Sequence, residues 1–84
     1  YSLFEGAAEL LEAEALETST LVGKPLKEVE FGDGVRIGAI IRGGKVIMPT
    51  GATRVEAGDL VIVFAIAKRV RQVEQMFRVI LDFF

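Results

Sequence analysis

The sequence predicts a small α+β domain in which a mainly antiparallel, partly closed sheet is capped by a C-terminal helix. Two β-branched runs, Val35–Arg42 and Lys45–Met48, meet at a Gly43-Gly44 pair that suits a tight hairpin. An unbroken apolar run follows at Leu60–Ile66, and the chain then changes to helical spacing over residues 67–77. The chain has 84 residues, so we expect one domain.

The hairpin is the clearest of these elements. Strict alternation over residues 35–42 predicts that the odd-numbered side chains share one face of the strand and the even-numbered ones the other. Pro49 ends the returning strand, because proline has no N–H to give to a ladder. The run Leu60–Ile66 has no polar face, and we therefore expect both of its faces to be buried.

The N-terminal third of the chain is less regular. Residues 1–7 are interpreted as a linker, and the domain is expected to occupy residues 8–84. Segment 8–17 is rich in Ala, Leu and Glu, which favours a helix, yet it alternates as a strand would. A short helix is expected between Thr18 and Val29, kept irregular by Pro25.

The C-terminal part is more strongly patterned. From Val70, apolar residues recur at helical spacing and form one stripe, which predicts the terminal helix. Residues 78–84 are strongly apolar and fit either a closing strand or a tail that docks on a partner. We favour their burial in a dimer.

Composition excludes several classes of protein. The net charge of −2 argues against a nucleic-acid-binding surface, and the absence of Cys and His removes the commonest metal ligands and general base. No apolar run is long enough to span a bilayer, and the acidic start does not resemble a signal peptide. The sequence is 51% hydrophobic, a surplus for so small a domain, which predicts an apolar face shared in a homodimer.

Arg42, at the mouth of the hairpin, is the residue most suited to binding. Its guanidinium would hold a phosphate or carboxylate of a ligand, or it would pair with an acid of the same chain such as Glu56 or Asp59. The sequence shows no paired base and nucleophile, so it predicts a binding or regulatory module and no enzyme. No metal site can be assembled from the scattered acidic residues.

Four motifs in order carry a family resemblance: SxLVGKxLxEV at Ser19–Val29, AIIRGG at Ala39–Gly44, IMP at Ile47–Pro49 and AGDLVIV at Ala57–Val63. Together they resemble the C-terminal domain of the RCK (regulator of K⁺ conductance) family, also called the TrkA-C domain. The resemblance covers roughly residues 8–80. It implies that segment 8–17 is a strand, so the expected order of elements is strand, helix, strand, strand, strand, helix.

This resemblance implies a regulatory and dimerisation domain of a cytoplasmic subunit, peripheral to the inner membrane, that controls potassium uptake through a membrane-embedded Trk-type transporter. It also implies that residues 1–7 lead from a Rossmann-like N-terminal domain that is missing here and would carry NAD(H) or ATP. No cofactor site is expected in these residues themselves.

In some relatives, the cleft between two copies of the domain binds cyclic di-AMP. Carried over residue by residue, the implied ligand-binding set is Ile41, Arg42, Met48 and Pro49. Met48 stands where cyclic-dinucleotide binders often have asparagine, and its thioether offers no equivalent donor and acceptor for a base edge.

Two other functions are compatible with the same residues. The domain would be a purely structural dimerisation module without a ligand, or it would serve an anion or dicarboxylate transporter.

Overall fold

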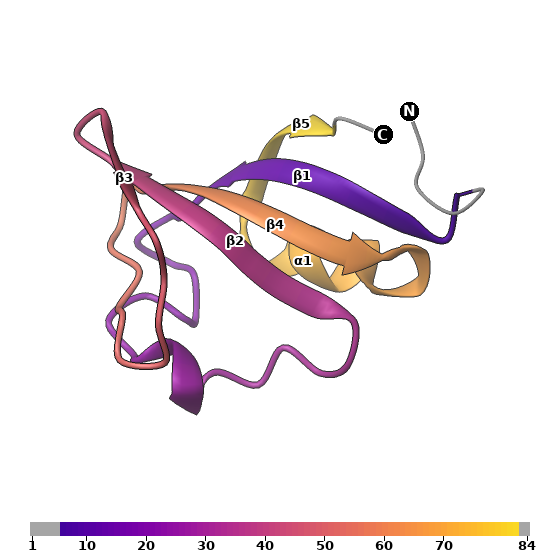
Figure 1. Cartoon of the computed structure of the whole chain (residues 1–84), viewed down its shortest axis with the longest axis horizontal. Helices are drawn as coiled ribbons and strands as arrows, with labels where there is room; N and C mark the ends of the chain where they lie inside the picture. Colours follow the sequence, from indigo (N-terminus) through magenta and orange to yellow (C-terminus); the bar gives the residue numbers. More distant parts are fainter. Residues whose placement is uncertain (1–5, 83–84) are drawn as a thin grey trace.

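Five antiparallel strands form one sheet in the order β3-β2-β4-β1-β5 (Figure 1). The computed structural model describes residues 6–82, with the backbone alone for residues 79–82. The strands are β1 (Ala8–Glu14), β2 (Val35–Arg42), β3 (Lys45–Ile47), β4 (Leu60–Ile66) and β5 (Arg78–Asp82).

In the described part of the chain, the outer strands of this sheet, β3 and β5, each have a free edge. Within residues 6–82, β3 and β5 each pair with one strand only, so the expectation of a partly closed sheet is wrong. The antiparallel arrangement is confirmed. The first strand is confirmed over residues 8–14, because pairing with β4 along its whole length outweighs its helical propensity. The closing strand is confirmed at β5, while Phe83 and Phe84 lie outside the described residues.

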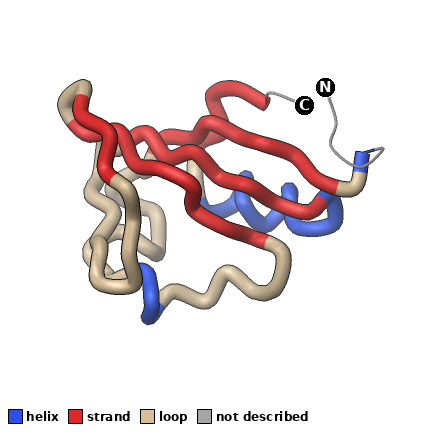
Figure 2. Tube along the Cα trace, viewed as in Figure 1, coloured by secondary structure: helices blue, strands red, loops and turns tan. Residues whose placement is uncertain are grey.

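One face of the sheet is covered by the terminal helix (Figure 2). A 3₁₀ turn, η3 (Ala67–Arg69), leads into α1 (Val70–Met76), which packs against β4 and β5. Val73 and Phe77 from this segment enter the core, as the helical stripe predicts. None of the helices in the described residues has the length and apolar character needed to cross a bilayer.

The short helix expected between Thr18 and Val29 is almost absent. Only the 3₁₀ turn η2 (Leu26–Glu28) forms there. Pro25 pairs instead with Arg54 as an isolated bridge, and Gly23 takes a left-handed φ of 86°, which interrupts a right-handed helix.

Two long loops cover the rest of the same face. The first, residues 15–34, hydrogen-bonds to the second, residues 48–59, through the Gly23 N–H to the Val55 carbonyl at 3.0 Å and the Leu26 N–H to the Thr53 carbonyl at 2.9 Å. Leu21 and Val55 are buried between the loops and the sheet. The two loops therefore complete the cover of this face of the sheet.

Strand β4 lies at the centre of the core. Val61, Val63 and Ala65 are fully buried, whereas the alternate side chains from Leu60 to Ile66 are only partly buried. The prediction that both faces of β4 are buried is therefore confirmed for one face and wrong for the other, which is only partly buried.

A β-bulge in β2 changes the predicted pattern of faces. Ile37 pairs with Val63 and Ala39 pairs with Ile62, so Gly38 is an extra residue in the ladder. Past the bulge the alternation is inverted, and Ile40 is fully buried on the same face as Val35. The prediction that Ile41 shares the face of Val35 is therefore wrong, and Arg42 lies on the core side.

Candidate functional site

Arg42 is held by three residues of a single loop, the one before β4. Its Nε donates to Asp59 Oδ1 at 2.9 Å and its Nη2 to Asp59 Oδ2 at 2.8 Å. Nη2 also donates to the Arg54 carbonyl at 2.9 Å, and Nη1 lies 2.7 Å from Glu56 Oε2. The guanidinium therefore ties the end of β2 to the loop before β4, which is the intrachain pairing that the sequence left open.

Asp59 is the buried member of this cluster, with a side chain 2% exposed. It also accepts the Glu56 backbone N–H at 2.9 Å, so both of its oxygens are bonded. Burial alone would raise the pKa of Asp59. The hydrogen bonds from Arg42 and Glu56 and the Arg42 charge outweigh that effect, so the pKa lies below its ordinary value.

The two acidic partners of Arg42 differ in their exposure to solvent. The hydrogen bond to Asp59 is the main cause that raises its pKa above the ordinary value. Its side chain is 35% exposed, and the Glu56 side chain beside Nη1 is 61% exposed. Nη1 therefore faces an exposed carboxylate, whereas Nε and the Asp59 contact of Nη2 face a buried one.

The other residues of the predicted ligand set do not converge on Arg42. Ile41 pairs with Val46 across the hairpin, on the opposite side of the sheet from Arg42. Met48 is 71% exposed after the end of β3. Pro49 is partly buried and lines a separate groove. Within one copy of the chain, these four residues therefore do not form a single site.

This groove, which the sequence did not predict, runs between the two long loops and β2. It consists of two adjoining hollows of about 550 and 260 Å³. Both are lined by Leu26, Phe31, Val35 and Arg36. The lining residues come from separate segments of the chain, so no local sequence motif predicts the groove.

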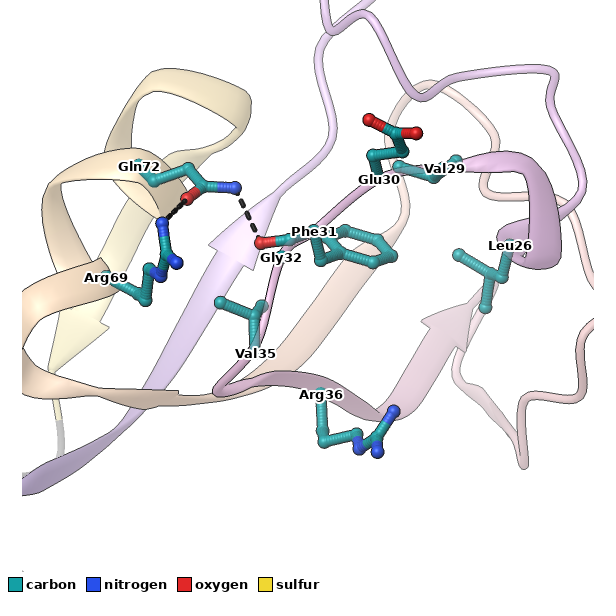
Figure 3. A pocket seen from close by; sticks show the side chains of 9 residues that line it. All are labelled: Leu26, Val29, Glu30, Phe31, Gly32, Val35, Arg36, Arg69 and Gln72. Carbon is teal, nitrogen blue, oxygen red and sulfur yellow. Dashed lines mark hydrogen bonds between the residues drawn. The ribbon is translucent and has the colours of Figure 1, made fainter.

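One wall of the groove is fixed by a small polar network (Figure 3). Gln72 Nε2 donates to the Phe31 carbonyl at 2.7 Å, and Gln72 Oε1 accepts from Arg69 Nη1 at 3.4 Å. Arg69 Nε donates to the Asp33 carbonyl at 3.2 Å. These bonds join α1 to the loop before β2. Among residues 6–82, no group of three or more acidic side chains is gathered as it would be around a metal ion.

The chain is similar in sequence to proteins that are named for potassium uptake. It is 54% identical over its whole length to a Trk system potassium uptake protein TrkA of Azorhizobium caulinodans, and 42% identical to the protein of that name from Halomonas elongata. The chain spans only 18% and 19% of these two relatives.

A structural comparison and a family model give results that agree with these sequence relatives. A solved structure described as an RCK domain with cda superimposes with a TM-score of 0.73 at 27% identity, covering 83% of this chain and 99% of the other. The TrkA-C domain model matches residues 10–78. This chain therefore belongs to the TrkA-C domain family.

Proposed function

We propose that this chain is the C-terminal regulatory domain of a cytoplasmic subunit that controls potassium uptake through a Trk-type membrane transporter. The observation that carries the proposal is the 54% identity over the entire chain to a protein named for potassium uptake. In this proposal, a Rossmann-like domain that binds NAD(H) or ATP precedes the chain in the whole protein. The domain itself performs no catalysis.

The domain acts as a homodimer in this proposal. Val46 and Met48 are 66% and 71% exposed, and both belong to the β2–β3 hairpin or its immediate continuation. Ile41 lies beside Val46 in the hairpin ladder. Exposed apolar side chains gathered in one place favour contact with a partner, and a second copy would bring two such hairpins together.

A small anionic effector would bind between the two copies, against Ile41, Met48 and Pro49. Arg42 would contribute its Nη1, in competition with the exposed Glu56 carboxylate. The effector would favour one relative orientation of the copies, and only its difference in affinity for the two orientations would act on the transporter.

Light scattering over a dilution series tests the dimer. We expect wild type to remain dimeric at micromolar concentration and Val46→Glu to be monomeric. The matched control is Leu16→Glu, which changes another exposed apolar residue, 39% exposed, in the loop after β1. A monomeric wild type, or equal dissociation by both variants, would contradict the proposal.

Calorimetric titration with cyclic di-AMP tests the effector site. Glu56→Gln removes the carboxylate that competes for Arg42 Nη1, so it should bind the anion more tightly than wild type. A dimer that takes up no cyclic di-AMP, with or without Glu56, would favour a purely structural dimerisation domain.

A further inference from the structure

Strand β2 has an edge that its hairpin partner only half covers. The strand runs over eight residues, but β3 pairs with Ile40, Ile41 and Arg42 alone. From Val35 to Ala39, the side of β2 turned away from β4 has no strand beside it in the described part of the chain. The unpaired backbone groups of such an edge can bind an added strand.

The groove lies along this same edge. Val35 and Ile37, on the core side of β2, line it together with Leu26, Phe31 and Pro49. Successive side chains of an extended peptide point to opposite sides. Alternate apolar side chains of an added strand would therefore enter the two hollows.

The charges around the groove are mostly positive. Lys27, Arg36 and Arg69 line it, against a single carboxylate from Glu30. Figure 3 shows Arg36 and Arg69 on different sides of Val35, with the Glu30 carboxylate turned away from both. In a chain whose net charge is −2, this is a local excess of cations.

These cations have no acidic partner within the described residues. Arg69 is bonded to the Asp33 carbonyl and the Gln72 amide, which hold it in place without neutralising it. Ion pairs in residues 6–82 involve other basic side chains, Arg42 and Arg78.

We propose that this edge binds an extended acidic segment of a partner protein by strand addition. Main-chain hydrogen bonds to residues 35–39 would hold the segment in register, and its apolar side chains would fill the groove. The carboxylates on the other side of the segment would pair with Arg36, which lies on the opposite face of β2 from Val35 and Ile37. The positive charges of Lys27 and Arg69 at the groove would add to the preference for an acidic sequence over a basic one. The inference does not depend on the proposed function.

NMR titration of the ¹⁵N-labelled chain tests this inference. The probe is a blocked hexapeptide of alternating glutamate and valine, and its control is the same peptide with lysine in place of glutamate. We expect the glutamate peptide alone to shift the amides of residues 35–39 and of the groove, with an affinity that falls as salt is added.

Variants locate the charges. Arg36→Glu should weaken binding about tenfold, because an attraction is replaced by a repulsion. Arg71→Glu is the matched control, since Arg71 is exposed on α1 and does not line the groove. Equal loss in both variants, equal binding of the two peptides, or shifts at β5 would overturn the proposal. So would concentration-dependent shifts of residues 35–39 without peptide, because a second copy would then occupy the edge.

Discussion

Replacing Asp59 by asparagine tests the central electrostatic contact of the domain. The change keeps the size of the side chain and one carbonyl oxygen, but removes the charge that two nitrogens of Arg42 face at 2.8 and 2.9 Å. A hydrogen bond to a charged group contributes about 1.5–3 kcal/mol to stability. Arg42 remains 35% exposed and beside Glu56, so water and that carboxylate recover part of the loss.

We therefore expect Asp59→Asn to lower the free energy of unfolding by about 2–3 kcal/mol at pH 7. A domain of this size has a total stability of about 4–13 kcal/mol, so the loss is large. It corresponds to a decrease of about 8–24 °C in Tm. Urea denaturation followed by far-UV circular dichroism measures the free energy directly.

The pH dependence separates this charge from simple packing. Because the folded-state pKa of Asp59 is lowered, its contribution is present above the ordinary carboxyl pKa and is lost as pH falls through the folded value. The difference between wild type and Asp59→Asn should therefore shrink below about pH 4. A difference under about 0.5 kcal/mol at pH 7, or one that stays constant to low pH, would refute the reasoning.

Three further substitutions probe the fold. Gly34→Ala should lower the free energy of unfolding by about 1–3 kcal/mol, measured in urea, because Gly34 has a φ of 88° and the new Cβ would lie 2.5 Å from Ile66. The control is Gly43→Ala, at a positive φ with no atom near the new Cβ, and an equal or larger loss there would contradict this prediction. Leu11→Ala should lower the free energy of unfolding by about 2–5 kcal/mol, because this side chain is only 1% exposed. An unchanged urea midpoint would show that Leu11 of β1 does not contribute to the stability of the core. Glu56→Gln should destabilise much less than Asp59→Asn in the same assay, since Glu56 is 61% exposed; equal losses would show that burial does not set the difference.

Much of the sheet could be predicted from the sequence, because alternation and turn residues are local signals. The hairpin, the β4 run and the terminal helix lie where the pattern of residues indicates. The segment from Ala8 to Glu14 could not be decided locally, since Ala, Leu and Glu favour a helix and only pairing with β4 and β5 makes it a strand.

The faces of β2 and the groove could not be predicted in the same way. A glycine inside a strand often marks a bulge, and Gly38 was the available signal for the inverted faces of Ile40 and Ile41. The sequence is compatible both with a ligand at Arg42 and with an ion pair between Arg42 and an acid of the same chain. Nothing in the sequence indicates that Asp59 is buried. Whether Ile41, Arg42, Met48 and Pro49 bind a ligand stays a prediction.

The Arg42–Asp59 contact also bears on the accuracy of strand pairing during folding. It joins the last residue of β2 to the residue that precedes β4, so it forms only when those strands align with the bulge at Gly38. A slip by one residue would turn Arg42 to the other face and leave the Asp59 carboxylate buried without its cation. The same two residues that stabilise the native alignment therefore make a shifted alignment costly, which protects this short sheet from mispairing.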